Sequence, residues 1–153
     1  MQLGFDRLIK AMDDLAPELN TDVIAQTGKG DYQPRNMQAR ERIGPGEFEQ
    51  LVEQCDLIVS HAGIGTVLTA QRFSTPIVLF PRRLDHGEHR NDHQVATAKN
   101  LEGRSGVLIA MDQAHLPAAI AEALAMKDAE ASLSRTAAQL HEAIGRFIEG
   151  EEL

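Results

Sequence analysis

The class of fold is indicated most clearly by residues 56–68, Asp56-Leu57-Ile58-Val59-Ser60-His61-Ala62-Gly63-Ile64-Gly65-Thr66-Val67-Leu68. The short apolar run of this stretch predicts a strand buried on both faces at 57–59, and the glycines after it predict a turn that opens a helix. This order is typical of a parallel α/β sheet, where the helix N-terminus offers backbone N–H groups to an anion. Because Gly63 and Gly65 carry no side chain that would hold a ligand away, we expect an anion site here.

A second apolar run, Pro76-Ile77-Val78-Leu79-Phe80-Pro81, follows the predicted helix. It leads into the polar segment 86–94, at the start of another predicted helix. The glycines do not form a full Gly-x-Gly-x-x-Gly pattern, and no acidic residue follows at the distance usual for dinucleotide-binding domains. A dehydrogenase-like domain is therefore the weaker interpretation.

The motifs together resemble the C-terminal domain of glycosyltransferase family 28 over roughly residues 3 to 125. Within this family the chain is more similar to the split members. These are the small catalytic subunit of the dolichol-linked N-acetylglucosaminyltransferase and PssE, a subunit of a bacterial exopolysaccharide glucuronosyltransferase. The residues that carry the resemblance are Ser60-His61-Ala62-Gly63-Ile64-Gly65-Thr66, the proline-led strand 76–81, Asn91-Asp92-His93-Gln94 with Val95, Ala96, Ala98 and Leu101, Phe5-Asp6-Arg7-Leu8 and Gln26-Thr27-Gly28.

Strands alternating with helices predict a single α/β domain over residues 1–153, with a three-layer Rossmann-like parallel sheet. We expect a core over about 3–125 and a C-terminal helix over about 130–149. The resemblance implies the donor-binding C-terminal half of a GT-B glycosyltransferase. The family's first strand precedes the first helix, and only Met1-Gln2-Leu3-Gly4 stands there. We therefore expect a truncated first strand, with an uncovered edge or an unfilled central place in the sheet.

The remaining elements follow from apolar spacing and from glycine and proline punctuation. We expect strands at 21–27, 37–43 and 106–111. Helices are expected from Phe5 to about Pro17, from about Phe48 to Cys55, over 63–73 with Val67, Leu68 and Phe73 toward the core, and from Leu116 to Leu124.

Composition restricts the class of partner. The formal net charge of the 153 residues is -8 at pH 7, which argues against binding nucleic acid or an anionic membrane through general electrostatics. No apolar run approaches the roughly 20 residues that span a bilayer. We expect a cytoplasmic protein that reaches the inner membrane only through a partner.

The resemblance implies that a UDP-sugar binds at the carboxyl edge of the sheet, as a substrate and with no cofactor or metal. The diphosphate is expected at residues 63–66, the uridine toward Gln26 and Ile43, and the sugar at Asp92 and Gln94. Many family members carry a glutamate for the ribose where this chain has Thr69, so weaker nucleotide binding is expected. The candidate donor-binding residues are Gln26, Thr27, Gly28, Ile43, Ser60, Ala62, Gly63, Ile64, Gly65, Thr66, Thr69, His93 and Gln94.

His61 and Asp92 are the candidate catalytic residues. Backbone N–H groups aimed at the leaving diphosphate stabilise its developing charge, and His61 adds a proton or a hydrogen bond, or only orients the turn. Two alternatives remain at the 86–94 segment. His86, His89 and His93 have a spacing that can hold zinc, and Asn91 or Asp92 can be a plain helix cap.

No base for the acceptor hydroxyl is evident in the sequence. Two-domain transferases of this type bind the acceptor in an N-terminal domain, so the resemblance implies a heteromer with a membrane-associated acceptor-binding subunit and a lipid-linked sugar acceptor. We expect an inverting hexosyltransferase, with N-acetylglucosamine as the first choice of sugar, followed by glucuronic acid and glucose. The alternative is a non-catalytic subunit that binds a nucleotide sugar or regulates a partner.

Overall fold

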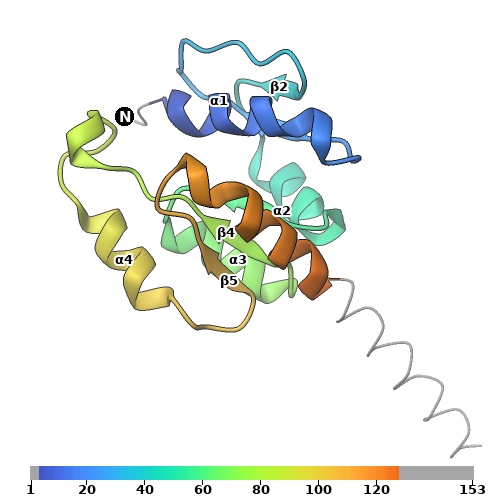
Figure 1. The fold of residues 1–153 in the computed structure, drawn as a ribbon. Coiled ribbons are helices and arrows are strands. Elements are labelled where there is room, and N and C mark those ends of the chain that lie inside the picture. The colour runs from blue at the N-terminus through green and yellow to red at the C-terminus, as the bar shows by residue number, and fades with distance from the viewer. Residues whose placement is uncertain (1–3, 128–153) are drawn as a thin grey trace, which may run out of the picture.

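The computed structural model of the chain describes residues 4–127, which form an α/β domain with parallel strands only (Figure 1). The expected C-terminal helix at about 130–149 lies outside the described residues. Each strand expected from the sequence is present, although each is short. The strands are β1 (Ile24–Gln26), β2 (Gln38–Arg40), β3 (Ile58–Ser60), β4 (Ile77–Leu79) and β5 (Val107–Ile109).

The strands divide into two parallel sheets. β1 pairs with β2, and β3, β4 and β5 pair in that order, with Val59 opposite Val78 and Val78 opposite Leu108. Among residues 4–127, β1 and β3 do not pair with each other.

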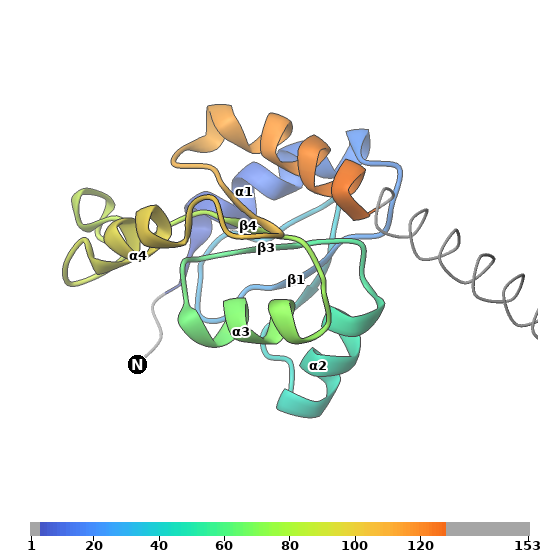
Figure 2. The ribbon, with the colours of Figure 1, turned by 90° about the horizontal axis from the view of Figure 1, so that it is seen from below.

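Helices cover both faces of the larger sheet, as a three-layer domain requires (Figure 2). The first helix and the helical residues 116–127 lie on one side, and the second and third helices lie on the other. The helices are α1 (Asp6–Leu15), α2 (Pro45–Gln54), α3 (Ile64–Arg72) and α4 (His93–Leu101), with shorter 3-10 turns at Ala16–Glu18, Leu84–His86 and Gln113–His115.

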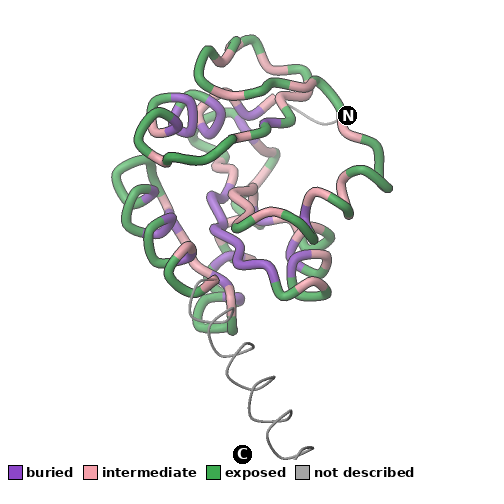
Figure 3. Tube along the Cα trace, turned by 90° about the vertical axis from the view of Figure 1, so that its right-hand side faces the viewer, coloured by how far each residue is buried: buried purple, intermediate pink, exposed green. Residues whose placement is uncertain are grey.

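The core is centred on β4, whose residues and Phe80 are at most 1% exposed (Figure 3). Successive strand side chains point to opposite faces, so β4 contributes to two apolar clusters. Val78 and Phe80 pack with residues of α1 and the 116–127 helix. Ile77 and Leu79 pack with residues of α3 and α4.

Two expectations about burial were wrong. The residues of β3 are only half-buried, because β3 is an edge strand with a single neighbour, β4. Leu68, expected in the core, is 60% exposed, because the side of α3 that packs on the sheet is formed by Val67 and Ala70.

Side chains of α1 form hydrogen bonds to the loop after β1 and to the loop after β4, which belong to different sheets. Asp6 Oδ2 and Oδ1 accept hydrogen bonds from the backbone N–H groups of Asp31 and Tyr32, at 3.1 and 3.2 Å, in the loop after β1. Arg7 forms an ion pair with Glu88 at 2.9 Å and donates to the Pro81 carbonyl at 3.1 Å, in the loop after β4. Adjacent residues of α1 therefore hold the carboxyl ends of strands that do not pair.

A buried carboxylate of α1 also bonds to the segment that precedes β2. Asp13 is 2% exposed and accepts hydrogen bonds from the Tyr32 hydroxyl at 2.7 Å and from the backbone N–H groups of Arg35 and Asn36. Desolvation by burial opposes ionisation, but these hydrogen bonds outweigh it and hold the pKa of Asp13 below its ordinary value. The segment that leads into β2 is thus fixed to α1 by a charged group.

Candidate functional site

The site is centred on the N-terminus of α3, directly after β3. Gly63 precedes the helix in an extended conformation, and no side chain caps the helix. Among residues 4–127, no acceptor faces the backbone N–H groups of Ile64, Gly65 and Thr66. Three N–H donors therefore lie without a partner among the described residues at the positive end of the helix dipole.

The N–H groups just before the helix already have partners within the protein. Gly63 donates to the carbonyl oxygen of His61 at 2.9 Å, and Ala62 donates to Gln94 Oε1 at 3.3 Å. An anion at this turn would therefore be bound by residues 64–66, while residues 62 and 63 fix the shape of the turn.

The two glycines of the turn serve different purposes. A Cβ atom on Gly63 would lie 2.6 Å from His61 Cε1, so glycine at this position leaves room for the imidazole ring. A Cβ atom on Gly65 would meet nothing within 4 Å, so its open side faces free space. The ring of His61 therefore packs against the turn at Gly63.

Gln94, at the start of α4, connects the ends of two strands. Its Oε1 accepts hydrogen bonds from the N–H groups of Ala62 and Arg82, at 3.3 and 2.9 Å, and its Nε2 lies 3.0 Å from His61 Nδ1. Burial and then the positive charge of Arg82 lower the pKa of His61, so its ring is neutral at neutral pH. Gln94, expected to contact the sugar, is here bonded to the protein through both ends of its amide.

The residues expected around the uridine lie together. Gln26 Oε1 accepts a hydrogen bond from the N–H of Ile43 at 3.1 Å, which joins the end of β1 to the loop before α2. Thr27 Oγ1 donates to the carbonyl of Arg40 at 3.3 Å. Gly28 has a positive φ of 57°, which glycine adopts without strain. These contacts form a second part of the rim, built on the smaller sheet.

The start of α4 is held by short polar contacts. Asp92 Oδ1 accepts from the N–H of Leu84 at 3.0 Å, and Asn91 Oδ1 accepts from the N–H of His93 at 3.0 Å. Asp92 is therefore a candidate catalytic residue whose carboxylate already has one backbone partner. His93, which was expected to contact the donor, is exposed.

The zinc alternative was wrong. No group of three or more His, Cys, Asp or Glu side chains within residues 4–127 is placed to hold a metal ion. His86 lies in a 3-10 turn and His93 begins α4, so the histidines do not share the single helical face that their spacing required.

Two hydroxyls near the turn bond to the protein backbone. Thr69 Oγ1 donates to the carbonyl of Gly65, one turn back in α3, at 3.0 Å. Ser60 Oγ donates to the carbonyl of His61 at 3.0 Å. The Thr69 hydroxyl, expected to take the place of a ribose-binding glutamate, is thus directed at its own helix.

Sequence reasoning missed the charged cluster behind the site. Arg82 Nη1 donates to the carbonyls of Gly4 and Glu88, at 3.1 and 3.3 Å, and its guanidinium lies 4.6 Å from the centre of the Phe5 ring. Glu88 is 8% exposed and pairs with Arg7, 81 residues away in the chain. Such a pair leaves no local pattern that could have revealed it.

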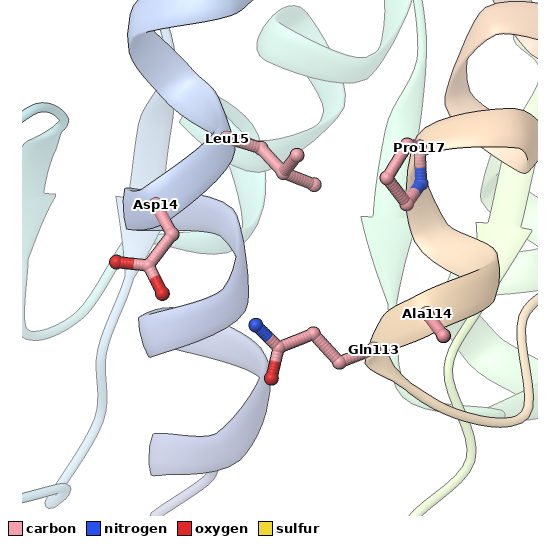
Figure 4. Close-up of a pocket in the computed structure, with 5 residues that line it drawn as sticks. All are labelled: Asp14, Leu15, Gln113, Ala114 and Pro117. Carbon is pink, nitrogen blue, oxygen red and sulfur yellow. The ribbon is translucent and has the colours of Figure 1, made fainter.

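Pockets of the described residues lie outside the turn at residues 62–66. One of about 460 Å³ lies between the end of α1 and residues 113–117, and none of the predicted site residues lines it (Figure 4). Another of about 290 Å³ lies between the first turn of α1 and the loop after β4, where Gly4, Arg7 and Glu88 line it. At the N-terminus of α3, Ile64 is 53% exposed.

The parallel sheets with helices on both faces match the fold of the C-terminal half of GT-B glycosyltransferases. Residues 3–146 match the glycosyltransferase family 28 C-terminal domain, and the chain belongs to this family. A comparison with curated proteins found no match.

Solved structures share the fold. The glycotransferase of kitacinnamycin superposes with a TM-score of 0.62 at 19% identity, covering 88% of this chain and 36% of its own. The spinosyn forosaminyltransferase SpnP gives 0.58 at 21% identity, covering 94% of this chain and 37% of its own. This chain thus spans little more than a third of the solved enzymes that it resembles.

Proposed function

We propose that this chain is the donor-binding subunit of an inverting glycosyltransferase that takes a hexose-type sugar from a UDP-sugar. The observation that carries the proposal is the set of three N–H groups at residues 64–66 that no described residue engages. They lie at a helix N-terminus on the carboxyl rim of a parallel sheet, the usual place for a phosphate. Family membership supports a nucleotide sugar as the ligand.

The chemistry follows from the leaving group. Glycosyl transfer leaves negative charge on the diphosphate, and N–H groups fixed by α3 stabilise that charge with little rearrangement. His61 lies beneath the same turn, and Asp92 and Gln94 stand at the start of α4, toward the proposed sugar position. The proposed uridine position lies at Gln26 and Ile43, which are already bonded to each other.

The acceptor side is proposed to come from another protein. The resemblance of the sequence to the split members of the family supports this proposal, because those members bind the acceptor through a separate subunit. No helix in the described part of the chain is long and apolar enough to cross a membrane. A membrane-associated subunit that binds a lipid-linked sugar would supply the acceptor site and the attachment to the membrane, with this chain on the cytoplasmic side.

The sugar is proposed to be N-acetylglucosamine, with glucuronic acid and glucose as the next candidates. Family resemblance to the split transferases supports this order. A thermal-shift panel of UDP-sugars ranks them, because a ligand that binds only the folded chain raises its melting temperature.

The decisive test removes one N–H group without disturbing the helix. Proline is tolerated at the first helical position, and Gly63 already has the extended conformation, φ -95° and ψ 129°, that suits a residue before proline. Ile64→Pro deletes one donor, and Ile64→Ala deletes the same exposed side chain but keeps the N–H. Calorimetry with UDP should show about 10-fold weaker binding for Ile64→Pro than for Ile64→Ala. Equal affinity of the two variants would reject the diphosphate site.

A non-catalytic nucleotide-sugar-binding protein is the second candidate. The contact of Thr69 with its own helix favours it, because this hydroxyl is not directed at a ribose. Sugar transfer by the chain mixed with a membrane-associated subunit encoded beside it separates the two. UDP-sugar binding without transfer in the mixture supports the second candidate, and transfer supports the first.

A further inference from the structure

The orientation of the Gln94 amide is fixed by its neighbours. Two backbone N–H groups, of Ala62 and Arg82, point at one end of the amide, and an N–H can only donate. That end must be the oxygen, because a flipped amide would place its NH2 group against two donors. The nitrogen end therefore faces His61 Nδ1 at 3.0 Å.

This orientation determines the tautomer of His61. The amide nitrogen of Gln94 can only donate, so Nδ1 must accept and carries no proton. In the neutral ring the proton then resides on Nε2. A protonated ring would bring the Nδ1–H against the Gln94 NH2 group, donor against donor, so this contact opposes imidazolium formation.

The other ring nitrogen, Nε2, is not fully buried and has no hydrogen-bond partner among the described residues. Within residues 4–127 no hydrogen bond reaches His61 Nε2, and it is not one of the buried polar atoms that lack a partner. The ring lies beneath Gly63, at the turn that leads to the three N–H groups of α3. With its proton on Nε2, His61 would therefore offer one more N–H donor at this turn.

We propose that Gln94 is a positioning residue that holds His61 as the Nε2–H tautomer. His61 then contacts the sugar nucleotide only by donating a hydrogen bond, and it cannot be the base for the acceptor hydroxyl. The only lone pair of the ring is engaged by Gln94. The role toward the donor rests on the proposed function, but the tautomer does not. The base must then come from Asp92 or from the acceptor-binding partner.

NMR of the complete chain with isotope-labelled histidine tests the proposal, since the nitrogen shifts of an imidazole distinguish its tautomers. The informative variant is Gln94→Glu. One carboxylate oxygen can still accept from Ala62 and Arg82, while the other requires a proton on Nδ1. The matched control is Gln71→Glu, which adds the same charge at an exposed position of α3.

We expect the unmodified chain and Gln71→Glu to show unprotonated Nδ1 and protonated Nε2 at neutral pH. Gln94→Glu should show protonated Nδ1, with the ring titrating at higher pH. A protonated Nδ1 or a mixture of tautomers in the unmodified chain would overturn the proposal, as would a Gln94→Glu spectrum equal to that of the control.

A second step separates this inference from the proposed function. UDP added to the unmodified chain should shift the Nε2 resonance and leave Nδ1 unprotonated. If the tautomer is as expected but UDP leaves Nε2 unmoved, the role of His61 toward the sugar nucleotide fails, while the tautomer assignment stands. If UDP also leaves the amides of residues 64–66 unmoved, the diphosphate site fails as well. If UDP shifts the amides of residues 64–66 and Nδ1 is protonated, the donor site stands and this inference fails.

Discussion

The two sheets of this domain differ in how they are held. The β3–β4–β5 sheet is covered on both faces, and β4 is at most 1% exposed. The β1–β2 pair has a single pairing, and Ile24 at its start is 39% exposed. The larger sheet is thus stabilised by burial, whereas the smaller pair depends on polar contacts to α1 made by Asp6 and Asp13.

The difference separates the parts of the candidate site. The proposed diphosphate position at α3 follows the larger sheet, and the proposed uridine position follows β1. α1 joins the two, because Asp6 holds the loop after β1 and Arg7 holds the loop after β4. The carboxyl rim is therefore assembled by neighbouring side chains of one helix in place of strand pairing.

The largest effect is expected from the core of the larger sheet. Phe80→Ala removes a fully buried ring that packs against Phe5 with ring centres 5.8 Å apart, and should lower the free energy of unfolding by about 3–5 kcal/mol. Urea denaturation measures it. Phe73→Ala, at a half-buried ring at the end of α3, is the matched control and should cost clearly less. Equal losses would mean that β4 is not the centre of the core.

An intermediate effect is expected where α1 holds the smaller pair. Asp13→Asn removes the negative charge that accepts hydrogen bonds from one hydroxyl and two backbone N–H groups. The free energy of unfolding should fall by about 2–3 kcal/mol. Asp14→Asn, at the exposed neighbouring position, should change it little. If both variants unfold at the same denaturant concentration, the polar tie contributes nothing.

The same carboxylate predicts a pH dependence. The pKa of Asp13 is lower in the folded chain than in the unfolded chain, so its contribution is complete above about pH 4 and is lost as the pH falls through the folded-state value. The stability difference between the unmodified chain and Asp13→Asn should therefore shrink when denaturation is repeated below about pH 4. A difference that stays constant with pH would show that ionisation of Asp13 is not the source.

The smallest effect is expected at the exposed side chain of β1. Ile24→Thr keeps a β-branched residue at a position that is 39% exposed, and should change the free energy of unfolding by at most about 0.5 kcal/mol. Val78→Thr makes a similar change in β4, where a buried hydroxyl without a partner costs about 1–3 kcal/mol. Similar losses at both positions would remove the contrast between the sheets.

Local patterns predicted the elements well. The helix from Phe5 toward Pro17 is present as α1, and the apolar runs around Ile58 and Ile77 are strands. Apolar spacing and glycine turns act over a few residues, so they are visible in a single sequence. The expectation of a parallel α/β domain followed from the same alternation and is confirmed.

The interactions that shape the rim could not be predicted in this way. Gln94 bonds to Ala62 across 32 residues, and Arg7 pairs with Glu88 across 81. The reason for Gly63 also depended on a contact in space, with the ring of His61, and not on the glycine pattern. The exposure of Leu68 and of β3 depends on which neighbours pack beside them, which periodicity does not specify.

The most direct test of the account is an amide NMR titration of the complete chain with UDP, with uridine as the control. The account predicts that UDP shifts the amide resonances of Ile64, Gly65 and Thr66 most strongly, because these N–H groups acquire the diphosphate as their acceptor. Uridine should shift only residues near Gln26 and Ile43. Amides at residues 64–66 that UDP leaves unmoved, or moves no more than uridine does, would contradict the central claim.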